Sequence, residues 1–226
     1  MIAENLESVR RRIARSCGKA NRPPQDVKLV AVTKEAETSE IEEALRLGVK
    51  ELGENRVQDA LLKYKDIAGR ATWHLIGHLQ TNKVKDAVKI FSLIHSVDSI
   101  RLAKEIDKEA KKMGKVQDIL IQVNTSGEST KFGLAPQEIL DVFKEICLYP
   151  NINIKGLMTI APEADDPEIV RPYFKALREL RDSVLPACRQ ADKAPNSILS
   201  MGMTNDFEVA IEEGANIVRI GRAIFG

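Results

Sequence analysis

Apolar positions along the chain follow two alternating periods. Short runs rich in Val, Ile and Leu recur between segments in which apolar residues return every three or four positions. Such short runs are typical of strands buried on both faces, and the longer period is typical of amphipathic helices. We predict eight strands, over residues 27–34, 49–53, 72–77, 91–94, 116–123, 152–160, 197–199 and 216–220.

Helical spacing fills the intervals between these strands. Ser39 and Glu42 form a predicted capping box for the helix after the first strand, and Gly18 and Gly48 are expected to close helices. Pro136 is suited to the first turn of another helix. The predicted helices cover residues 2–17, 57–67, 100–113 and 172–184, with further ones after Ser39, near Thr81, after Pro136 and around Ala210.

This alternation of strands and helices predicts one parallel α/β domain over residues 1–226. Eight strands are the number that closes a barrel, and no dinucleotide-binding fingerprint follows the first strand. We therefore predict a single (β/α)8 TIM barrel rather than an open, doubly wound sheet. The chain ends at Gly226, too early for a full eighth helix, and we expect the extra N-terminal helix to fill that gap.

Charge and composition exclude several classes of partner. The 34 Lys and Arg residues nearly balance 33 Asp and Glu residues, and only 4% of residues are aromatic, so nucleic acid is not expected as a partner. No apolar run approaches the ~18 residues of a membrane span. Cys17, Cys147 and Cys188 form no C-x-x-C pair and are interpreted as reduced, which predicts a cytoplasmic protein. No residues have metal-ligand spacing.

The first strand ends at Lys34, which carries the most specific candidate chemistry. A lysine at the mouth of a buried strand has its stem in apolar surroundings, and desolvation would favour the free amine. Such an amine can form a Schiff base with a carbonyl compound. The alternative is a lysine whose charged end simply reaches solvent.

The segment after the seventh strand offers a partner for this lysine. Ser200, Gly202 and Thr204 place hydroxyls and backbone N–H groups at the predicted start of a helix, where an anion is favoured. Phosphate sites of such barrels often use the loops after strands seven and eight. An ordinary N-cap at Thr204, followed by the acidic Asp206, explains the segment equally well. An amine and a phosphate site together are what pyridoxal 5'-phosphate (PLP) needs.

Six ordered motifs carry a family resemblance. The chain resembles the pyridoxal phosphate homeostasis proteins, which are single-domain relatives of the N-terminal barrel of alanine racemase. The motifs are Val30-Ala31-Val32-Thr33-Lys34, Gly53-Glu54-Asn55, His74-Leu75-Ile76-Gly77-His78-Leu79-Gln80, Gly156-Leu157-Met158-Thr159, Ser200-Met201-Gly202-Met203-Thr204 and Val218-Arg219-Ile220-Gly221.

The resemblance implies a role for each site residue. Lys34 would be the Schiff-base lysine and Arg219 would face the pyridine nitrogen. The phosphate would be bound by Ser200, Thr204 and the backbone of Gly221, while Asn55 and Met158 would line the cofactor. Thr204 stands where we expect a serine, which keeps the hydroxyl.

The resemblance also implies function. We expect a cytoplasmic monomer that reversibly holds PLP and takes part in vitamin B6 and amino-acid homeostasis. Its partners would be PLP-dependent apoenzymes or a regulatory protein. The alternative is a PLP-dependent amino-acid racemase with weak activity, which needs a second acid or base such as a tyrosine. His74 and His95 are interpreted as structural. His78 lies in a strand-end loop, where it could approach the ligand or be a loop histidine with satisfied partners. The tyrosines, Tyr64, Tyr149 and Tyr173, are expected in or beside helices.

Overall fold

Eight parallel strands form a closed barrel in the computed structural model, which describes residues 1–184 and 198–226. Each strand pairs with its neighbours in chain order, and β1 also pairs with β8. The predicted (β/α)8 barrel is confirmed, although Ser197 of the seventh predicted strand lies outside the described residues. The strands are β1 (Lys28–Val32), β2 (Glu51–Glu54), β3 (Thr72–Leu75), β4 (Leu93–Val97), β5 (Gln117–Gln122), β6 (Ile152–Met158), β7 (Ile198–Ser200) and β8 (Ile217–Ile220).

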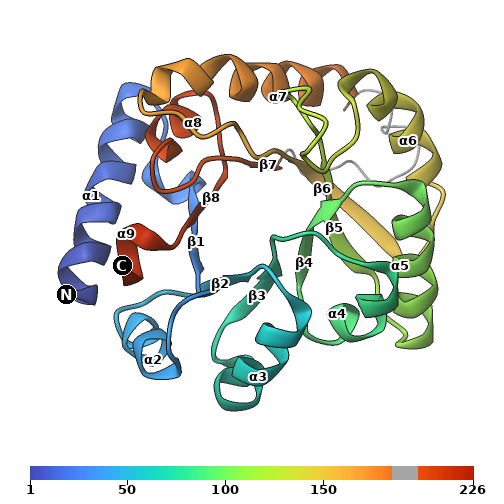
Figure 1. Cartoon of the computed structure of the whole chain (residues 1–226), viewed down its shortest axis with the longest axis horizontal. Helices are drawn as coiled ribbons and strands as arrows, with labels where there is room; N and C mark the ends of the chain where they lie inside the picture. The colour runs from blue at the N-terminus through green and yellow to red at the C-terminus, as the bar shows by residue number, and fades with distance from the viewer. Residues whose placement is uncertain (185–197) are drawn as a thin grey trace.

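Helices surround the strands as an outer layer (Figure 1). They bury their apolar faces against the outward-facing strand residues, and the resulting core includes Trp73, Phe143 and Phe207. The α-helices are α1 (Ile2–Lys19), α2 (Thr38–Arg46), α3 (Val57–Ile67), α4 (Val84–Ile90), α5 (Ile100–Lys112), α6 (Ile139–Ile146), α7 (Arg171–Val184), α8 (Phe207–Glu212) and α9 (Arg222–Phe225), and short 3-10 helices are η1 (Pro24–Asp26), η2 (Ala68–Arg70), η3 (Thr81–Lys83), η4 (Pro136–Glu138) and η5 (Pro167–Val170).

The N-terminal helix α1 fills the place beside the short helices α8 and α9, as predicted. Arg12 forms an ion pair with Glu208 of α8 at 2.8 Å, and its guanidinium lies 4.5 Å from the ring centre of Phe207. The amide of Asn5 donates to the carbonyl of Ile224 in α9 at 3.0 Å. These contacts attach α1 where a full eighth helix would otherwise cover the barrel.

Three predicted helix ends are wrong. Helix α1 continues through Gly18, and the first residue with a left-handed backbone is Asn21, at φ 50°. Helix α2 begins two residues earlier than expected, because Glu37 rather than Ser39 is the N-cap residue and Glu40 rather than Glu42 accepts from its backbone N–H at 2.8 Å.

The third wrong end is that of helix α8, which has Asp206 rather than Thr204 at its N-cap position. The carboxylate of Asp206 accepts from the backbone N–H of Met203 and so holds the chain in a turn before the helix starts. Thr204 therefore lies in a turn outside the helix.

The interior of the barrel divides into an apolar and a polar part. The apolar part, here called the interior cluster, consists of Val30, Leu93, Leu120, Met158 and Ile217. The polar part includes the buried side chains of His74, His95, Ser200 and Arg219. Polar groups buried in this way need hydrogen-bond partners, and the site described below supplies them.

Two further expectations concern membrane-spanning helices and the cysteines. No helix among the described residues is long and apolar enough to cross a membrane. Cys17 is a free and buried thiol, whereas Cys147 is disulfide-bonded, so the prediction of three reduced cysteines is wrong. Wide spacing in sequence is no guide here, because a disulfide depends on the distance between cysteines in space. Cys188 lies outside the described residues.

Candidate functional site

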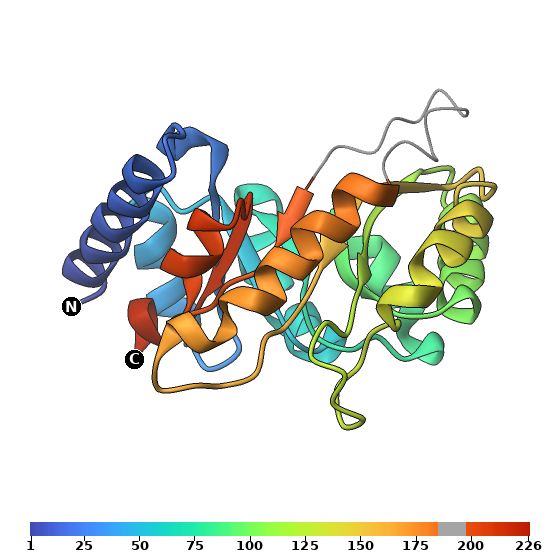
Figure 2. The same cartoon turned by 90° about the horizontal axis from the view of Figure 1, so that it is seen from above.

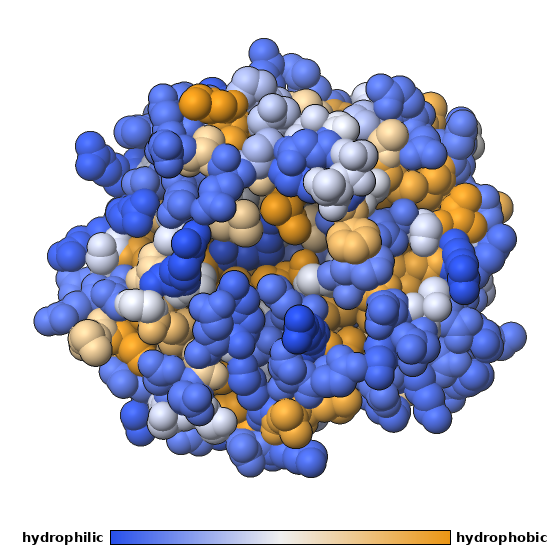
Figure 3. All heavy atoms as spheres, in the orientation of Figure 1, coloured by the Kyte–Doolittle hydropathy of each residue, from blue (hydrophilic) through white to orange (hydrophobic). Residues whose placement is uncertain are grey.

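The predicted site residues meet at the carboxyl ends of the strands. Lys34 and Asn55 follow β1 and β2, Met158 and Ser200 end β6 and β7, and Arg219 belongs to β8. Because all eight strands are parallel, these ends share one edge of the barrel, and the loops after β5 and β6 lie together on that side (Figure 2). The face in Figure 3 is hollowed near its centre, where hydrophilic and apolar atoms lie side by side.

Lys34 is more accessible than its sequence suggested. Its side chain is 45% exposed and forms an ion pair at 3.0 Å with the exposed Glu35. The predicted desolvation of the amine is therefore absent. Alternation along β1 places Lys34 on the same face as Val30, which belongs to the interior cluster. The amine thus stands at the barrel mouth, within reach of a ligand from solvent.

Arg219 is buried and oriented by two acceptors. Its guanidinium donates to the Ser200 hydroxyl at 2.6 Å and to the Thr159 carbonyl at 2.9 Å. Burial lowers the pKa of Arg219 to about 10, a shift that the charge of Asp206 opposes, so the group is cationic at neutral pH. A guanidinium has five N–H donors, so donors remain for a further acceptor.

The hydroxyl of Ser200 points into the barrel interior. It accepts from Arg219 and makes a second hydrogen bond with His95 Nδ1 at 2.9 Å. Ser200 has no exposed surface. The structure therefore links Ser200 to Arg219, whereas the expectation was that Ser200 and Thr204 turn their hydroxyls toward one anion.

The segment from Gly202 to Thr204 passes unusually close to helix α8. Gly202 has φ +92°, and a Cβ at this position would lie 2.6 Å from the Cβ of Ala210 and 2.8 Å from the Cα of Phe207. Only glycine allows this approach. Among the residues that the structure describes, the backbone N–H groups of Gly202 and Thr204 have no hydrogen-bond partner. These two donors are available to an anion.

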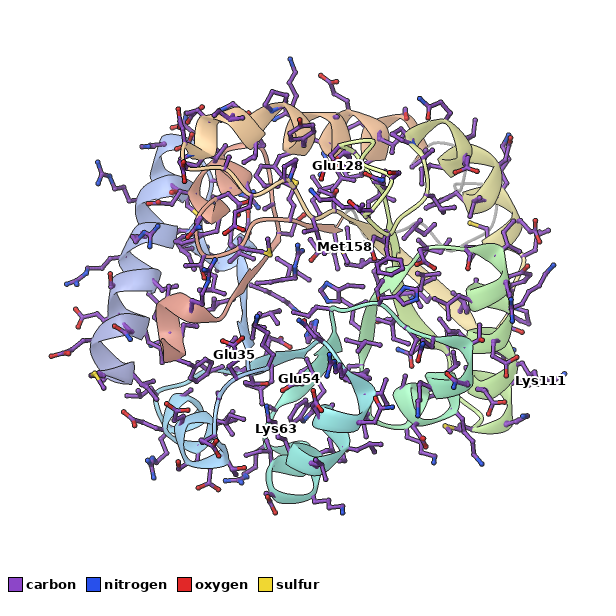
Figure 4. The ribbon with its side chains drawn as sticks, in the orientation of Figure 1. Glu35, Glu54, Lys63, Lys111, Glu128 and Met158 are labelled. Carbon is purple, nitrogen blue, oxygen red and sulfur yellow. The ribbon has the colours of Figure 1, made fainter. Side chains whose placement is uncertain are left out.

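Asn55, Met158 and Gly221 complete the predicted set. Met158 is buried in the interior cluster and lies near the barrel centre (Figure 4), whereas Asn55 is exposed. Gly77 packs on the backbone of Asn55, where a Cβ would approach the Asn55 oxygen to 2.3 Å. Gly221 lies beside Val32 of β1, whose carbonyl oxygen would be 3.1 Å from a Cβ. The mouth is thus lined from β1, β2, β6, β7 and β8.

Two histidines that sequence reasoning treated as structural are connected to this site. His95 Nε2 lies 2.8 Å from His74 Nδ1, and His74 Nε2 lies 2.9 Å from the carboxylate of Glu51. Burial, together with the nearby His74 and Arg219, holds the pKa of His95 well below its usual value. The strand alternation contained a signal for this connection, because these residues occupy inward positions on β2, β3 and β4.

Comparison with known proteins places the chain in a family. The family model for the N-terminal domain of alanine racemase matches residues 4–226. A protein of Aquifex aeolicus named pyridoxal phosphate homeostasis protein is 47% identical over 224 residues, which cover 99% of this chain and 96% of the relative. The protein of the same name from Pseudomonas aeruginosa is 36% identical and is covered to 95%. The chain belongs to the pyridoxal phosphate homeostasis protein family.

Solved structures agree with this assignment. PipY of Synechococcus elongatus PCC7942, solved with PLP bound, is 33% identical and has a TM-score of 0.85, and each chain is covered completely. An alanine racemase of Clostridium difficile shares the fold with a TM-score of 0.72 and 17% identity, and 56% of its length is covered. The predicted likeness to the racemase barrel and to this family is confirmed.

The groups at the mouth of this family member fit the functional groups of PLP. The cofactor carries an aldehyde, a phosphate and a pyridine nitrogen, and proteins bind these with an amine, with anion donors and with a group facing the nitrogen. The structure provides the accessible amine of Lys34, the free N–H groups of Gly202 and Thr204, and the spare donors of Arg219. All three belong to the same edge of the barrel.

The other candidate groups are His78 and the three tyrosines. His78 Nδ1 lies 3.1 Å from Asp98, and its ring stacks on Phe132 at 3.9 Å, which confirms the interpretation of His78 as a loop residue with satisfied partners. The tyrosines lie on or next to helices as predicted: Tyr64 in α3, Tyr173 in α7 and Tyr149 just after α6. Within residues 1–184 and 198–226, no three His, Cys, Asp or Glu residues form a potential metal site.

Proposed function

We propose that this protein binds PLP at the carboxyl mouth of the barrel, holds it reversibly through Lys34 and hands it to acceptor apoenzymes. The observation that carries this proposal is the shared position of an accessible lysine amine and a buried arginine with spare donors. The family membership and the PLP bound to PipY support the identity of the ligand. A role in cellular vitamin B6 and amino-acid pools follows from such a carrier.

Lys34 performs the covalent step. Its unprotonated amine adds to the aldehyde carbon, a carbon–nitrogen double bond forms, and the aldehyde oxygen leaves as water. The step is reversible, because water or another amine attacks the same carbon and frees the lysine. The 45% exposure of Lys34 favours this exchange, since the amine can be reached from solvent. A carrier needs such release, whereas an enzyme that retains its cofactor does not.

The remaining residues hold and orient the ligand. The backbone N–H groups of Gly202 and Thr204, with the Thr204 hydroxyl and the backbone of Gly221, would bind the phosphate. Because Ser200 is engaged by Arg219 and His95, its contribution to the phosphate is indirect. Asn55 and Met158 would line the ring.

Arg219 sets the chemistry that the site can support. When bound, PLP serves as an electron sink, and the sink is strongest when a carboxylate keeps the pyridine nitrogen protonated. A cationic arginine that donates to this nitrogen leaves it unprotonated. Arg219 remains cationic at neutral pH despite its burial. This favours holding the cofactor over carbanion chemistry.

The competing function is amino-acid racemisation. It needs a second acid or base on the opposite face of the substrate, and in alanine racemase that group is a tyrosine. The described part of this chain offers no tyrosine from a strand-end segment, since all three lie on or next to helices. We therefore propose binding without efficient turnover.

Transfer of the cofactor tests the proposed function. The purified, PLP-loaded protein is mixed with an excess of a PLP-dependent apoenzyme, and the recovery of that enzyme's activity is followed beside a free-PLP control. We expect transfer from the wild type and no stoichiometric loading of Lys34→Ala. A parallel assay measures deuterium exchange at the Cα of L-alanine in heavy water. Lys34-dependent exchange with inversion at ~1–10³ s⁻¹, the ordinary enzymatic range, would establish a racemase instead.

A further inference from the structure

Five polar side chains cross the barrel interior in one continuous line. From the carboxyl mouth inward, the successive atom pairs are Arg219 to Ser200 at 2.6 Å, Ser200 to His95 at 2.9 Å, His95 to His74 at 2.8 Å and His74 to Glu51 at 2.9 Å. The first four residues are at most 3% exposed. Glu51 ends the line, where Lys28 lies 3.5 Å from its other carboxylate oxygen.

With one proton on each imidazole, the two ends of this line fix the direction of every hydrogen bond in it. A guanidinium can only donate and a carboxylate can only accept, whereas a neutral imidazole donates from one nitrogen and accepts at the other. Ser200 accepts from Arg219, so its own proton goes to His95 Nδ1. His95 then donates from Nε2 to His74, and His74 donates from Nε2 to Glu51. With both imidazoles neutral, this is the arrangement that satisfies all five groups.

The reverse direction is unfavourable because it leaves the Ser200 hydroxyl proton without an acceptor. If His95 carried its proton on Nδ1, it would donate to Ser200, and His74 would need a proton on each nitrogen. The Ser200 hydroxyl would then receive two donors and would have to place its own proton elsewhere. Among the described residues, its hydroxyl has no partner other than Arg219 and His95. A buried hydroxyl without an acceptor costs free energy, so the forward direction is preferred.

We propose that His95, His74 and Glu51 are positioning residues of the candidate cofactor site, which act on Arg219 through Ser200. This inference rests on the proposed function. This line of hydrogen bonds directs the Ser200 proton away from the mouth, so that the Ser200 oxygen accepts from Arg219. The guanidinium is thus held by Ser200 on one side and by Thr159 on the other. Supporting hydrogen bonds of this kind hold a functional group in its productive geometry.

Glu51 also differs from a carboxylate that merely sits at the same end of the barrel. Burial alone would raise the pKa of Glu51, but its hydrogen bond with His74 and the nearby Lys28 lower it. Asp118 of β5 is a matched control. It accepts from Asn153 at 2.8 Å and lies 3.7 Å from Lys155, with no link to Arg219.

Three variants test this line of hydrogen bonds. Glu51→Ala removes the terminal acceptor, Glu51→Gln keeps a carbonyl acceptor for His74, and Asp118→Ala removes the control carboxylate. For each folded variant, histidine-selective ¹⁵N NMR of the cofactor-free protein reports which ring nitrogens carry protons. Titration with PLP then gives the affinity and the absorption spectrum of the complex. If Glu51→Ala does not fold, His95→Phe breaks the chain at its centre with a ring of similar size.

The expected results separate positioning from a purely structural role. In the wild type, His95 and His74 should each carry a proton on Nε2 that is donated to the next group in the line, and Glu51→Ala should lose this pattern. PLP affinity should fall ~3–10-fold in Glu51→Ala, the equivalent of about one neutral hydrogen bond, with a shifted absorption band. Glu51→Gln and Asp118→Ala should bind as the wild type does.

Two results would overturn the proposal. One is a proton on Nδ1 of His95 in the wild type. The other is wild-type affinity and spectrum in Glu51→Ala when NMR shows that the line of hydrogen bonds is lost. If the wild type itself does not bind PLP, the proposed function and the positioning role both fail, while the NMR measurement alone still decides whether the directed chain exists.

Discussion

Two lysines near the carboxyl ends of β1 and β2, Lys34 and Lys63, have opposite surroundings. Lys63 of α3 lies outside the barrel wall and is 16% exposed, and it donates to the Glu54 carboxylate at 2.8 Å and to the Thr33 carbonyl. Lys34 follows Thr33 directly, yet it is 45% exposed, and within the described part of the chain its ion-pair partner is the solvent-exposed Glu35. Figure 4 labels Glu35, Glu54 and Lys63, which lie in the same part of the barrel near α3.

The comparison shows that the surroundings of a lysine decide its use. Glu54 is fully buried and also accepts from the Thr33 hydroxyl at 2.6 Å, so Lys63 neutralises a charge that the fold could not otherwise tolerate. An exposed pair such as Lys34 with Glu35 is worth only ~0–1 kcal/mol and is readily given up. Lys63 therefore stabilises the fold, whereas the amine of Lys34 is accessible to a ligand.

The largest expected effect is that of Lys34→Ala, which should abolish covalent attachment of PLP. The absorption band of the bound cofactor should disappear, while the free energy of unfolding changes by less than ~1 kcal/mol, since only an exposed pair is lost. Absorption spectroscopy and urea denaturation measure the two quantities. Lys63→Met is the control, and it should keep the band. A band of wild-type intensity in Lys34→Ala would show that PLP is not attached through Lys34.

The second effect concerns stability and should appear in Lys63→Met. This change leaves the Glu54 carboxylate buried without its cation, which typically costs about 3–5 kcal/mol. Urea denaturation should show the loss, and the double variant Lys63→Met, Glu54→Gln should recover a large part of it. If Lys63→Met unfolds at the wild-type urea concentration, Glu54 does not depend on Lys63.

The fold was predictable because hydrophobic periodicity repeats in every unit, whereas the positions of polar side chains depend on neighbours far apart in sequence. The alternation of strands and helices predicted the barrel and the edge at which Lys34 and Arg219 meet. It could not show that Asp206 rather than Thr204 occupies the N-cap position of α8, because that depends on a turn in which the Met203 N–H donates to the Asp206 carboxylate. The link from Arg219 to His95 also required the distance between β8 and β4.

A smaller effect is expected at the phosphate. Thr204→Ala should weaken PLP binding, because a charge-assisted hydrogen bond is worth ~1.5–3 kcal/mol, or roughly 10–100-fold in affinity. Pyridoxal, which lacks the phosphate, should bind weakly to the wild type and equally weakly to the variant. Competition titrations with both ligands measure this. Equal weakening for pyridoxal and for PLP would show that Thr204 acts on the fold and not on the phosphate.

The smallest effect is a dependence of stability on pH. The pKa of His95 is lowered in the folded protein by burial and by His74 and Arg219, so below its ordinary value of 6.5 the unfolded chain binds a proton that the folded chain excludes. This contribution is absent above 6.5 and destabilises the fold increasingly as pH falls toward the folded-state pKa.

His95→Phe should remove that contribution. The difference in unfolding free energy between wild type and variant should therefore shift in favour of the variant by up to ~1.4 kcal/mol per pH unit below 6.5. Urea denaturation at several pH values measures the slope. Parallel slopes for the two proteins would mean that His95 binds its proton equally in both states.

The most direct test of the account is to locate the attached cofactor. The PLP-loaded wild type is reduced with borohydride, digested and mapped by mass spectrometry, and an unreduced sample serves as the control. The account predicts one pyridoxyl group per chain, on Lys34, with Lys63 unmodified. A pyridoxyl group on Lys63, Lys83 or Lys131 while Lys34 remains unmodified would contradict it.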